Sequence, residues 1–439
     1  MTVTAQRVHG PEEYLATAQE KFLQRAYLLP GLFSDPEIFR LEKERIFARA
    51  WHFVAHESEI PRPGDYVVRY VADDPLIIVR TESGEIRALY NMCRHRGMQV
   101  CRAEAGNAAF FRCPYHGWTY KNTGELIGVP FHREVYGAEG LQRGEWPLIS
   151  VRLESYEGLL FANLDPEAIP LREYLGEATF YLDFYLKKST AGLEVRGAPD
   201  RWIFPANWKL GADNFIGDAY HTAFTHRSTV EVGILPVPDA NFHKDGPQAI
   251  VGPWAGGYVP NLPYAALYPH LVGTMRANLT PAHHAIMDHD LWQSHSTLFP
   301  NVSFLNAPGI MPGTAPVAYF TLRVWRPLGP DRMEIWSWYL VERDAPEEWK
   351  EASYRAYVLQ FGTSGTLEQD DTENWSSITK VAKGQLARTI PLNYRMGLDH
   401  LQPLTDWPGP GQAYPVDYTE YAQRHFWTTY FEWMCSNSR

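Results

Sequence analysis

The 439-residue sequence has few cysteines and no long apolar run. Only four cysteines occur, too few to staple a chain of this length, so we expect them to stay reduced and available as ligands. No run of about 18 apolar residues appears, which argues against a membrane span. The first twenty residues lack the apolar core of a secretory signal. We therefore expect a cytoplasmic protein.

Positive charge is also scarce. Lys and Arg total 40 against 51 Asp and Glu, a formal net charge of -11, and the sequence has no Lys/Arg run. A polyanionic partner would meet general repulsion, so we exclude nucleic acid and a membrane surface as partners. Aromatic residues, by contrast, are abundant, with 15 Trp, 25 Tyr and 21 Phe. Such side chains fill cores, and they also suit a pocket for an apolar ligand.

Turn signals and residue periodicity divide the sequence into three parts. Residues 1–40 are typical of helix and loop, and we expect this N-terminal helical segment to pack on the larger domain. Residues 41–165 hold short segments rich in Val, Ile and Tyr between Pro-Gly, Asp-Asp and Ser-Gly turns, which predicts a small antiparallel β domain. Residues 166–439 mix both periodicities and predict a larger α+β domain. In the small domain, strands are expected at 65–70, 76–80 and 85–90.

The larger part has its own expected elements and excursions. Helices are predicted at 171–187 and 346–361, and strands at 318–325 and 333–341. Two Pro/Gly-rich spans, 236–271 and 391–415, are typical of loops or lids. The sequence shows no internal repeat and no nucleotide-binding Gly-rich fingerprint.

A first group of metal-binding residue types lies in the small domain. Cys93-x-His95 is followed, after 17 residues, by Cys113-x-x-His116. In a Rieske [2Fe–2S] centre two thiolates hold one iron and two imidazoles the other, which two mixed Cys/His arms can supply. Zinc also takes Cys₂His₂ sets, but usually from Cys-x₂₋₄-Cys and His-x₃₋₅-His arms. Cys101 has no such partner and is interpreted as a core residue.

A second group lies near the start of the larger domain. His221 and His226 are separated by four residues, which places them about 140° apart on an ideal helix. Both can face one ion only if the helix distorts or ends between them. Asp218 lies one turn before His221. Taken alone, the two histidines are better explained as satisfied polar residues that bind nothing.

Three motifs together resemble a known family. C-R-H-R-G, C-P-Y-H-G-W and N-W-K-x-x-x-D-N-F-x-G-D-x-Y-H-x-x-x-x-H are similar to the motifs of the large (alpha) subunit of Rieske non-haem iron aromatic-ring-hydroxylating dioxygenases. The resemblance is strongest to the naphthalene, biphenyl and polycyclic aromatic hydrocarbon dioxygenases. It implies Cys93, His95, Cys113 and His116 as ligands of the [2Fe–2S] cluster, and His221 and His226 as ligands of a mononuclear Fe(II).

The third ligand of the mononuclear iron should be a carboxylate, completing a 2-His-1-carboxylate facial triad. The segment FGTSGTLEQDDTENW is similar to the family's E-x-D-D-x-x-N motif, in which the second aspartate binds iron. We therefore choose Asp371, with Asp370 left open as the alternative. The segment is expected to end the helix predicted at 346–361.

The resemblance also implies a fold and an assembly. A small all-β Rieske domain should accompany a catalytic domain whose antiparallel sheet is flanked by helices, of the helix-grip or START-like type. The expected assembly is an α3 trimer, or α3β3 with a small beta subunit. Electrons from NADH should arrive through a separate reductase and ferredoxin. Asp218, the expected catalytic residue, would hydrogen-bond His221 and also His116 of the partner subunit, and Asn214 and Tyr220 are weaker candidates for residues that support the iron ligands.

The implied reaction adds both atoms of O₂ to an aromatic ring to give a cis-dihydrodiol. Positions that resemble the substrate pocket lining contain no Lys or Arg, which favours an uncharged aromatic hydrocarbon, with a fused multi-ring hydrocarbon as the hypothesis. Leu367 stands where some naphthalene-oxidising relatives carry Trp. The six positions are Phe215, Thr222, His295, Leu305, Phe361 and Leu367.

Several alternatives remain open from the sequence. The same architecture serves phthalate-type aromatic acid dioxygenases and Rieske monooxygenases or demethylases. A Rieske electron carrier would need only the first group of residues, and a zinc-binding module would need no third carboxylate. A further possible chelating set, PAHHAIMDHD, contains His283, His284, Asp288 and His289, which a solvated loop explains equally well.

Overall fold

The computed structural model of the protein describes residues 10–137, 140–235, 237, 239, 244–311 and 315–436. Other positions of the three predicted parts, including residues 1–9, lie outside the described residues. The chain divides into two compact units. Phe47–Arg172 form the smaller unit, and the larger unit combines the residues up to Ile46 with those from Glu173 onward.

The main sheet of the smaller unit is antiparallel and, within the described residues, seven-stranded, in the order β2-β11-β10-β5-β4-β3-β6. The strands predicted at 65–70, 76–80 and 85–90 are confirmed as β3, β4 and β5. The bounds are β2 (His52–His56), β3 (Asp65–Val71), β4 (Asp74–Arg80), β5 (Ile86–Tyr90), β6 (Ala105–Asn107), β10 (Ser150–Tyr156) and β11 (Leu159–Asn163).

A second small sheet of the same unit has the order β7-β8-β9. A buried cluster joins it to the main sheet, with Leu89 from β5 and Tyr120 from β8 both fully enclosed. Cys93, Cys101 and Cys113 belong to this cluster. The bounds are β7 (Phe110–Arg112), β8 (Thr119–Lys121), β9 (Leu126–Gly128) and the following helix α3 (His132–Tyr136).

The larger unit is built on an antiparallel sheet with nine described strands. Its order is β12-β19-β18-β17-β16-β15-β14-β21, and β13 also pairs with β19. The strands predicted at 318–325 and 333–341 lie within β18 and β19 and are confirmed. The bounds are β12 (Leu193–Val195), β13 (Asp200–Phe204), β14 (Gln248–Val251), β15 (Trp254–Pro260), β16 (Leu291–Leu298), β17 (Val302–Gly309), β18 (Val317–Gly329), β19 (Arg332–Glu342) and β21 (Gln412–Tyr414).

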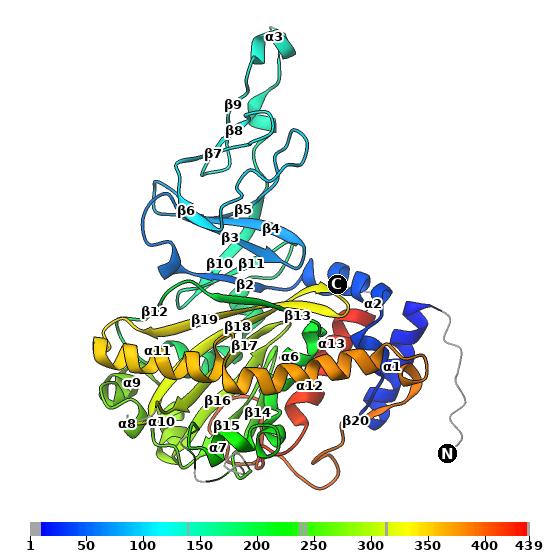
Figure 1. Ribbon diagram of the computed structural model, residues 1–439, viewed down its shortest axis with the longest axis vertical. Helices are drawn as coiled ribbons and strands as arrows, with labels where there is room; N and C mark the ends of the chain where they lie inside the picture. Colours follow the sequence, from blue (N-terminus) through cyan, green and yellow to red (C-terminus); the bar gives the residue numbers. More distant parts are fainter. Residues whose placement is uncertain are drawn as a thin grey trace. The chain divides into compact units, whose positions relative to one another are not determined.

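Helices flank this sheet, as Figure 1 shows. α6 (Trp208–Gly217) packs on β15 to β18, and α11 (Glu347–Phe361) packs on β17 to β19. α6 approaches the sheet closely at Gly211, where a Cβ would lie only 2.4 Å from the ring of Trp325 on β18. α12 (Thr366–Ala382) follows α11, and α13 (Tyr421–Cys435) packs on α6. The predicted class, α+β with a small all-β domain and a larger domain whose antiparallel sheet is flanked by helices, is confirmed.

One predicted helical stretch is confirmed but interrupted, and one local prediction for the larger unit was wrong. The helix expected at 171–187 is two helices, α4 (Leu171–Leu175) and α5 (Ala178–Leu186), because Gly176 between them has a φ of +49°. The described part of 236–271, expected as a loop, contains β14, β15 and α8 (Tyr264–Leu267). Gly256 of β15 explains this, since a Cβ there would lie 2.5 Å from the His295 carbonyl oxygen of β16. Glycine in this segment serves close strand pairing.

The N-terminal residues are tied to the larger unit. α1 (Pro11–Arg25) packs on α13, and β1 (Tyr27–Leu28) pairs with β20 (Leu392–Asn393). At the end of α2 (Pro36–Glu42), the buried Glu42 carboxylate accepts hydrogen bonds from Lys209 Nζ (2.5 Å), Trp208 Nε1 (2.9 Å) and Tyr430 OH (2.7 Å). This carboxylate therefore anchors the start of α6.

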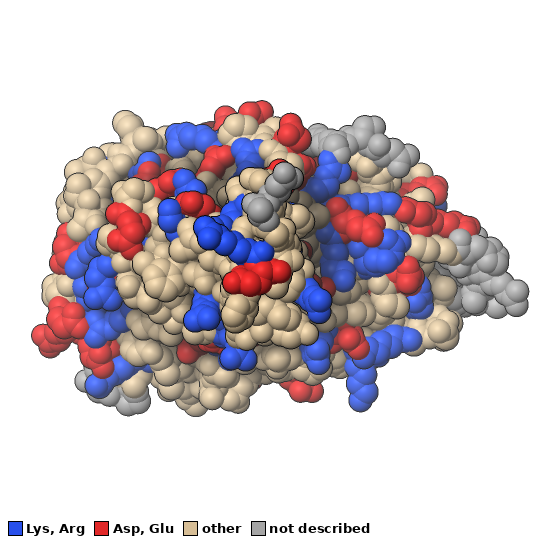
Figure 2. Space-filling model, turned by 90° about the horizontal axis from the view of Figure 1, so that it is seen from above, with Lys and Arg blue, Asp and Glu red and all other residues tan. Residues whose placement is uncertain are grey.

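Charges of both signs share the surface. On the face seen in Figure 2, Lys and Arg side chains are interspersed with Asp and Glu side chains. Exposed ion pairs such as Lys121–Glu125 (2.7 Å) and Arg87–Glu85 (2.9 Å) have this pattern. Among the described residues, no helix has the length and apolar character needed to cross a bilayer.

Candidate functional site

The Cys93 loop of the smaller unit follows β5 and turns back on itself. Cys93 N donates to Met98 O (2.8 Å), and Gly97 N donates to Cys93 O (2.9 Å). Gly97 has a φ of +77°, a conformation that favours glycine. His95 therefore lies at the tip of a tight loop whose base is Cys93.

The Cys113 loop, between β7 and β8, repeats this hydrogen-bond pattern. Cys113 N donates to Trp118 O (2.8 Å), and Gly117 N donates to Cys113 O (3.0 Å). Gly117 has a φ of +74°. Two loops of the same construction thus each present one cysteine and one histidine, as a two-arm metal site requires.

The two histidines of these loops lie side by side. The ring centroids of His95 and His116 are 4.6 Å apart, and His95 stacks on Trp118 at 5.0 Å. Burial, His116 and Arg96 lower the pKa of His95, which favours the neutral imidazole. Its Nδ1 is buried and has no hydrogen-bond partner within the described part of the chain. A neutral ring with a free nitrogen is the form that binds a metal.

The two thiols are equally suited to a metal. Cys93 and Cys113 are each 2% exposed, and both are free. Burial raises the pKa of the Cys93 thiol, so its thiolate needs a nearby cation. Tyr120 OH lies 3.5 Å from Cys93 Sγ and accepts a hydrogen bond from Arg94 N (3.0 Å). The donor set, two buried thiols and two adjacent imidazoles, fits a Rieske cluster.

The second candidate centre begins at the end of α6. Asn207 caps the helix start by accepting from Lys209 N (3.0 Å). α6 ends at Gly217, and a 3₁₀ turn, η5 (Ala219–Ala223), and the short helix α7 (Arg227–Glu231) follow. His221 lies on the 3₁₀ turn and His226 at the N-cap of α7. The helical turn that carries His221 ends at Ala223, between the two histidines, as the expectation required.

The acidic segment lies on α12, not at the end of α11 as the sequence predicted. The helix is interrupted between Phe361 and Thr366, because two glycines in this segment approach the backbone of α11 closely. A Cβ at Gly365 would lie 2.3 Å from Gln360 O, and one at Gly362 would lie 2.7 Å from Val358 O. The break redirects the chain, so that Asp371 falls in the second turn of a new helix.

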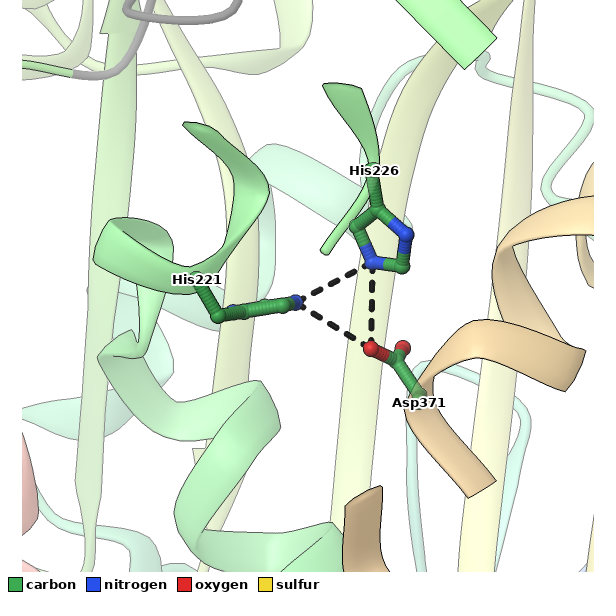
Figure 3. A group of neighbouring side chains, drawn as sticks. All are labelled: His221, His226 and Asp371. Atoms are coloured by element: carbon green, nitrogen blue, oxygen red, sulfur yellow. Dashed lines mark hydrogen bonds and ion pairs between the residues drawn. The ribbon is translucent and has the colours of Figure 1, made fainter. Parts of the chain in front are cut away.

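The histidines and Asp371 converge on one point (Figure 3). His221 Nε2 lies 3.1 Å from His226 Nε2. Asp371 Oδ1 lies 3.2 Å from His221 Nε2 and 3.0 Å from His226 Nε2. Their candidate ligand atoms all lie within 4.8 Å of one another, and no other such three-residue group occurs among the described residues. The arrangement can hold one divalent metal ion on two imidazoles and one carboxylate.

Other side chains contact the outer ring nitrogens. His221 Nδ1 contacts the backbone oxygen of Asp218. Two side-chain atoms also lie near this nitrogen, Asp218 Oδ2 at 3.6 Å and Asn214 Nδ2 at 3.5 Å. His226 Nδ1 lies 3.3 Å from Asp370 Oδ2. Such contacts orient the rings and fix which nitrogen faces the metal. Asp370 therefore contacts the nitrogen of His226 that points away from the candidate metal position, whereas Asp371 contacts the nitrogen that points toward it.

Electrostatics hold the three front groups together. Burial alone would raise the pKa of the Asp371 carboxyl, but His226 and His221 hold it well below its ordinary value. Burial would lower the pKa of His221, but Asp218 and Asp371 outweigh this and raise it. The pocket thus favours a carboxylate with positive charge beside it, which a bound cation can supply.

A cavity with an empty volume of about 600 Å³, its mouth included, opens beside these groups. The described lining residues include no Lys or Arg. Five lining residues were not predicted from the sequence: Ala219, Leu235, Ser294, Ala307 and Pro308. Ala307 could have been found, because it lies two positions after Leu305 on β17 and therefore on the same face of the strand. All six residues singled out for the pocket line it: Phe215, Thr222, His295, Leu305, Phe361 and Leu367.

The remaining candidates have other surroundings. On α10 (Pro281–Asp288), His283 Nε2 contacts Phe180 O (2.8 Å) and His284 Nε2 contacts Arg276 O (2.8 Å). Asp288 pairs with the guanidinium of Arg276 from α9 (Val272–Asn278). The PAHHAIMDHD segment therefore has protein partners on three of its four candidate ligands. The solvated loop expected there was wrong, because the segment forms α10 and His283 is buried.

Tyr220 is 44% exposed, and its ring packs on Phe224 and Tyr418.

The geometry of both centres agrees with the comparison of the chain with known families. A model described as ring hydroxylating alpha subunit (catalytic domain) matches residues 171–436, more than half of the chain. The chain belongs to this family. A model of the Rieske [2Fe-2S] domain matches residues 50–152, the region of the two Cys/His loops.

Relatives of the family cover nearly the whole chain. Biphenyl 2,3-dioxygenase subunit alpha of Rhodococcus jostii (strain RHA1) is 38% identical over 93% of this chain and 88% of its own. Benzene 1,2-dioxygenase subunit alpha of Pseudomonas putida is 37% identical over 93% and 91%. The crystal structure of naphthalene 1,2-dioxygenase from Rhodococcus sp., bound to indole, has 48% identity and a TM-score of 0.92, covering 98% of this chain and 99% of that one.

The ring-hydroxylating alpha subunit is thus a Rieske-type dioxygenase component. It carries a Rieske [2Fe–2S] cluster and a mononuclear iron, and, as an alpha subunit, it works with other protein components. The family, the enzyme class and the cofactors expected from the sequence motifs are confirmed.

Proposed function

We propose that this alpha subunit is the terminal oxygenase for an uncharged aromatic hydrocarbon, with a polycyclic ring system as the favoured substrate. It would add both atoms of O₂ to the ring and release a cis-dihydrodiol. The observation that carries the proposal is the position of the His221, His226 and Asp371 group at the wall of an apolar cavity.

The ligand assignments follow from the donor atoms. Cys93, His95, Cys113 and His116 would hold the [2Fe–2S] cluster, since they are the two buried thiols and two adjacent imidazoles of the paired loops. In the larger unit, the iron would be bound by the inner nitrogens of the two histidines and by Oδ1 of the carboxylate: His221, His226 and Asp371. Such a triad leaves positions open for O₂ beside the substrate, and the bound iron supplies the activation of O₂.

The protein's own groups would orient and shield the reacting atoms. Asp218 and Asp370 would hold the outer nitrogens of His221 and His226, which fixes the ring orientations. Apolar walls exclude water and place a flat ring against the metal face of the cavity. Among the polar lining side chains, Thr222 and His295 are the candidates to orient one edge of the ring.

The apolar lining supports a hydrocarbon over an aromatic acid. A carboxylate substrate would be buried without a cation to pair with, which is costly. The described lining residues offer none. A phthalate-type acid is therefore the weaker candidate.

The finer partners are also proposals. Electrons would pass from NADH through a reductase and a ferredoxin to the cluster. The assembly would be an α3 trimer or an α3β3 complex with a small beta subunit. Asp218 would link His221 to His116 of the partner subunit, and its side chain, 39% exposed, is accessible for such a contact. A cytoplasmic location agrees with the four free cysteines.

Metal analysis of purified protein, reconstituted anaerobically, tests the two-centre assignment. We expect about three irons to two acid-labile sulfides per chain. Two irons to two sulfides would reduce the protein to an electron carrier, and zinc in place of iron would reject the assignment. Turnover with ¹⁸O₂ and redox partners should then place two labelled oxygens in the product, whereas one would indicate a monooxygenase.

Pocket depth gives a separate prediction. Leu367 lines the cavity one turn before Asp371, so Leu367→Trp should shorten the space beside the metal. We expect turnover of four-ring hydrocarbons to fall at least about tenfold, because overfilled pockets tolerate little extra volume. Naphthalene turnover should change less. Product ratios for naphthalene, phenanthrene and pyrene measure this, and identical profiles for both proteins would contradict it.

A further inference from the structure

Arg323 is a buried cation at the centre of the catalytic sheet. It lies on β18, paired in register with Ser303 of β17 and Ser337 of β19, and is fully buried. It does not line the cavity. A guanidinium in such a place is costly unless its hydrogen bonds and charge are satisfied, so its partners indicate what it serves.

Those partners lie on both sides of the helix break. Arg323 Nη2 donates to Phe361 O (2.8 Å), the last residue of α11. Arg323 Nη1 pairs with the Glu368 carboxylate on the first turn of α12, where Glu368 is 1% exposed. One guanidinium therefore fixes where α11 ends and where α12 begins. Asp371 follows Glu368 by three residues and lies about one helical turn further along α12.

The same guanidinium lies behind two cavity walls. It is 4.8 Å from the ring centroid of Phe361 and 5.1 Å from that of Phe215, which belongs to α6. Both rings line the cavity. Cations are attracted to the faces of aromatic rings at these distances. The contacts of Arg323 thus reach α6, α11 and α12, the elements around the candidate metal site.

We propose that Arg323, through its ion pair with Glu368, is a positioning residue that sets the place of the Asp371 carboxylate and of the Phe215 and Phe361 walls. The inference rests on the proposed iron-binding role of Asp371. It goes further, because it assigns a role to two residues that touch neither metal nor substrate. A metal site tolerates ligand displacements of only about 0.5 Å, so a shift at the start of α12 would be felt at the metal.

A merely structural ion pair makes a different prediction. Replacing both members of a buried pair by apolar residues is often neutral for stability, whereas removing one is not. The double variant Arg323→Met/Glu368→Leu therefore separates the two roles. If the pair only fills the core, restoring stability restores the site as well. If it positions α12, stability returns but the site does not.

The test is a titration of the mononuclear site with Fe(II) alone. Protein with its cluster intact but the mononuclear iron removed is titrated anaerobically, and the ferrous nitric oxide complex is followed by electron paramagnetic resonance. The variants are Glu368→Gln and the double variant. The matched control is Glu334→Gln, another buried carboxylate on this sheet, which pairs with Arg201 (2.6 Å) and Arg326 (2.6 Å). Thermal unfolding and cluster absorbance are recorded for each.

We expect Glu368→Gln to raise the apparent dissociation constant for Fe(II) about tenfold, as loss of outer support does at metal sites. The double variant should unfold near the wild-type temperature yet bind Fe(II) as weakly as Glu368→Gln. Glu334→Gln should lose stability but keep Fe(II) affinity within about twofold.

Three outcomes would overturn the inference: wild-type affinity in Glu368→Gln, recovery of affinity in the double variant, or an equal loss in Glu334→Gln. Failure of the wild-type protein to bind one Fe(II) per chain at this site would instead reject the proposed function itself.

Discussion

Replacing Asp371 by asparagine is expected to empty the mononuclear iron site while the Rieske cluster stays in place. The substitution keeps the shape of the side chain but removes the one negative charge that faces both inner nitrogens, at 3.2 and 3.0 Å. Two neutral imidazoles and an amide are poor ligands for Fe(II). Affinity should fall by more than the roughly 10- to 100-fold that loss of an outer contact costs.

The neighbouring aspartate provides the matched control. Asp370 contacts His226 Nδ1, the nitrogen that points away from the metal position, at 3.3 Å. Asp370→Asn should therefore weaken Fe(II) binding only about tenfold and keep measurable turnover. Iron per chain should fall from three to two in Asp371→Asn, with unchanged cluster absorbance. If Asp370→Asn emptied the site and Asp371→Asn did not, the ligand assignment would be reversed.

This pair of aspartates shows where sequence reasoning reaches its limit. Two adjacent carboxylates on a helix point about 100° apart, so only one can face the histidines. Which one does so depends on where α12 begins, and that start depends on Gly365, whose Cβ would collide with Gln360 O. We expected the acidic segment to end the helix predicted at 346–361, whereas in the structure it lies on a new helix, α12.

Motifs with short spacing were easier to predict. The Cys93 and Cys113 loops and the histidine pair each lie within a few residues, so local backbone geometry, with glycines at positive φ in both loops, sets their shape. Contacts between residues far apart in the sequence could not be predicted from such local patterns. The strands in 236–271 form because β15 pairs with β16, and Arg323 meets Glu368 across 45 positions, a pairing that no local pattern indicates.

The second large effect is expected in the smaller unit, where Cys113→Ser should abolish the Rieske cluster. A serine hydroxyl does not replace a thiolate on iron, and the Cys113 loop has no other thiol to offer in the described residues. The visible absorbance of the cluster should be lost entirely, and turnover with ferredoxin should fall to background. Because the two units have separate cores, one iron per chain should remain at the His221 site.

Cys101→Ser is the control for this loss, because it removes a thiol from the same buried cluster of residues. Cys101 is 6% exposed, and its Sγ donates to Ala103 O (3.5 Å). Serine can keep that hydrogen bond, so we expect full cluster absorbance and a stability loss of about 1–3 kcal/mol from burying a more polar group. Iron and sulfide analysis with absorbance spectra separates the two variants. Loss of the cluster in Cys101→Ser, or its survival in Cys113→Ser, would show that the ligand set is not the one formed by the paired loops.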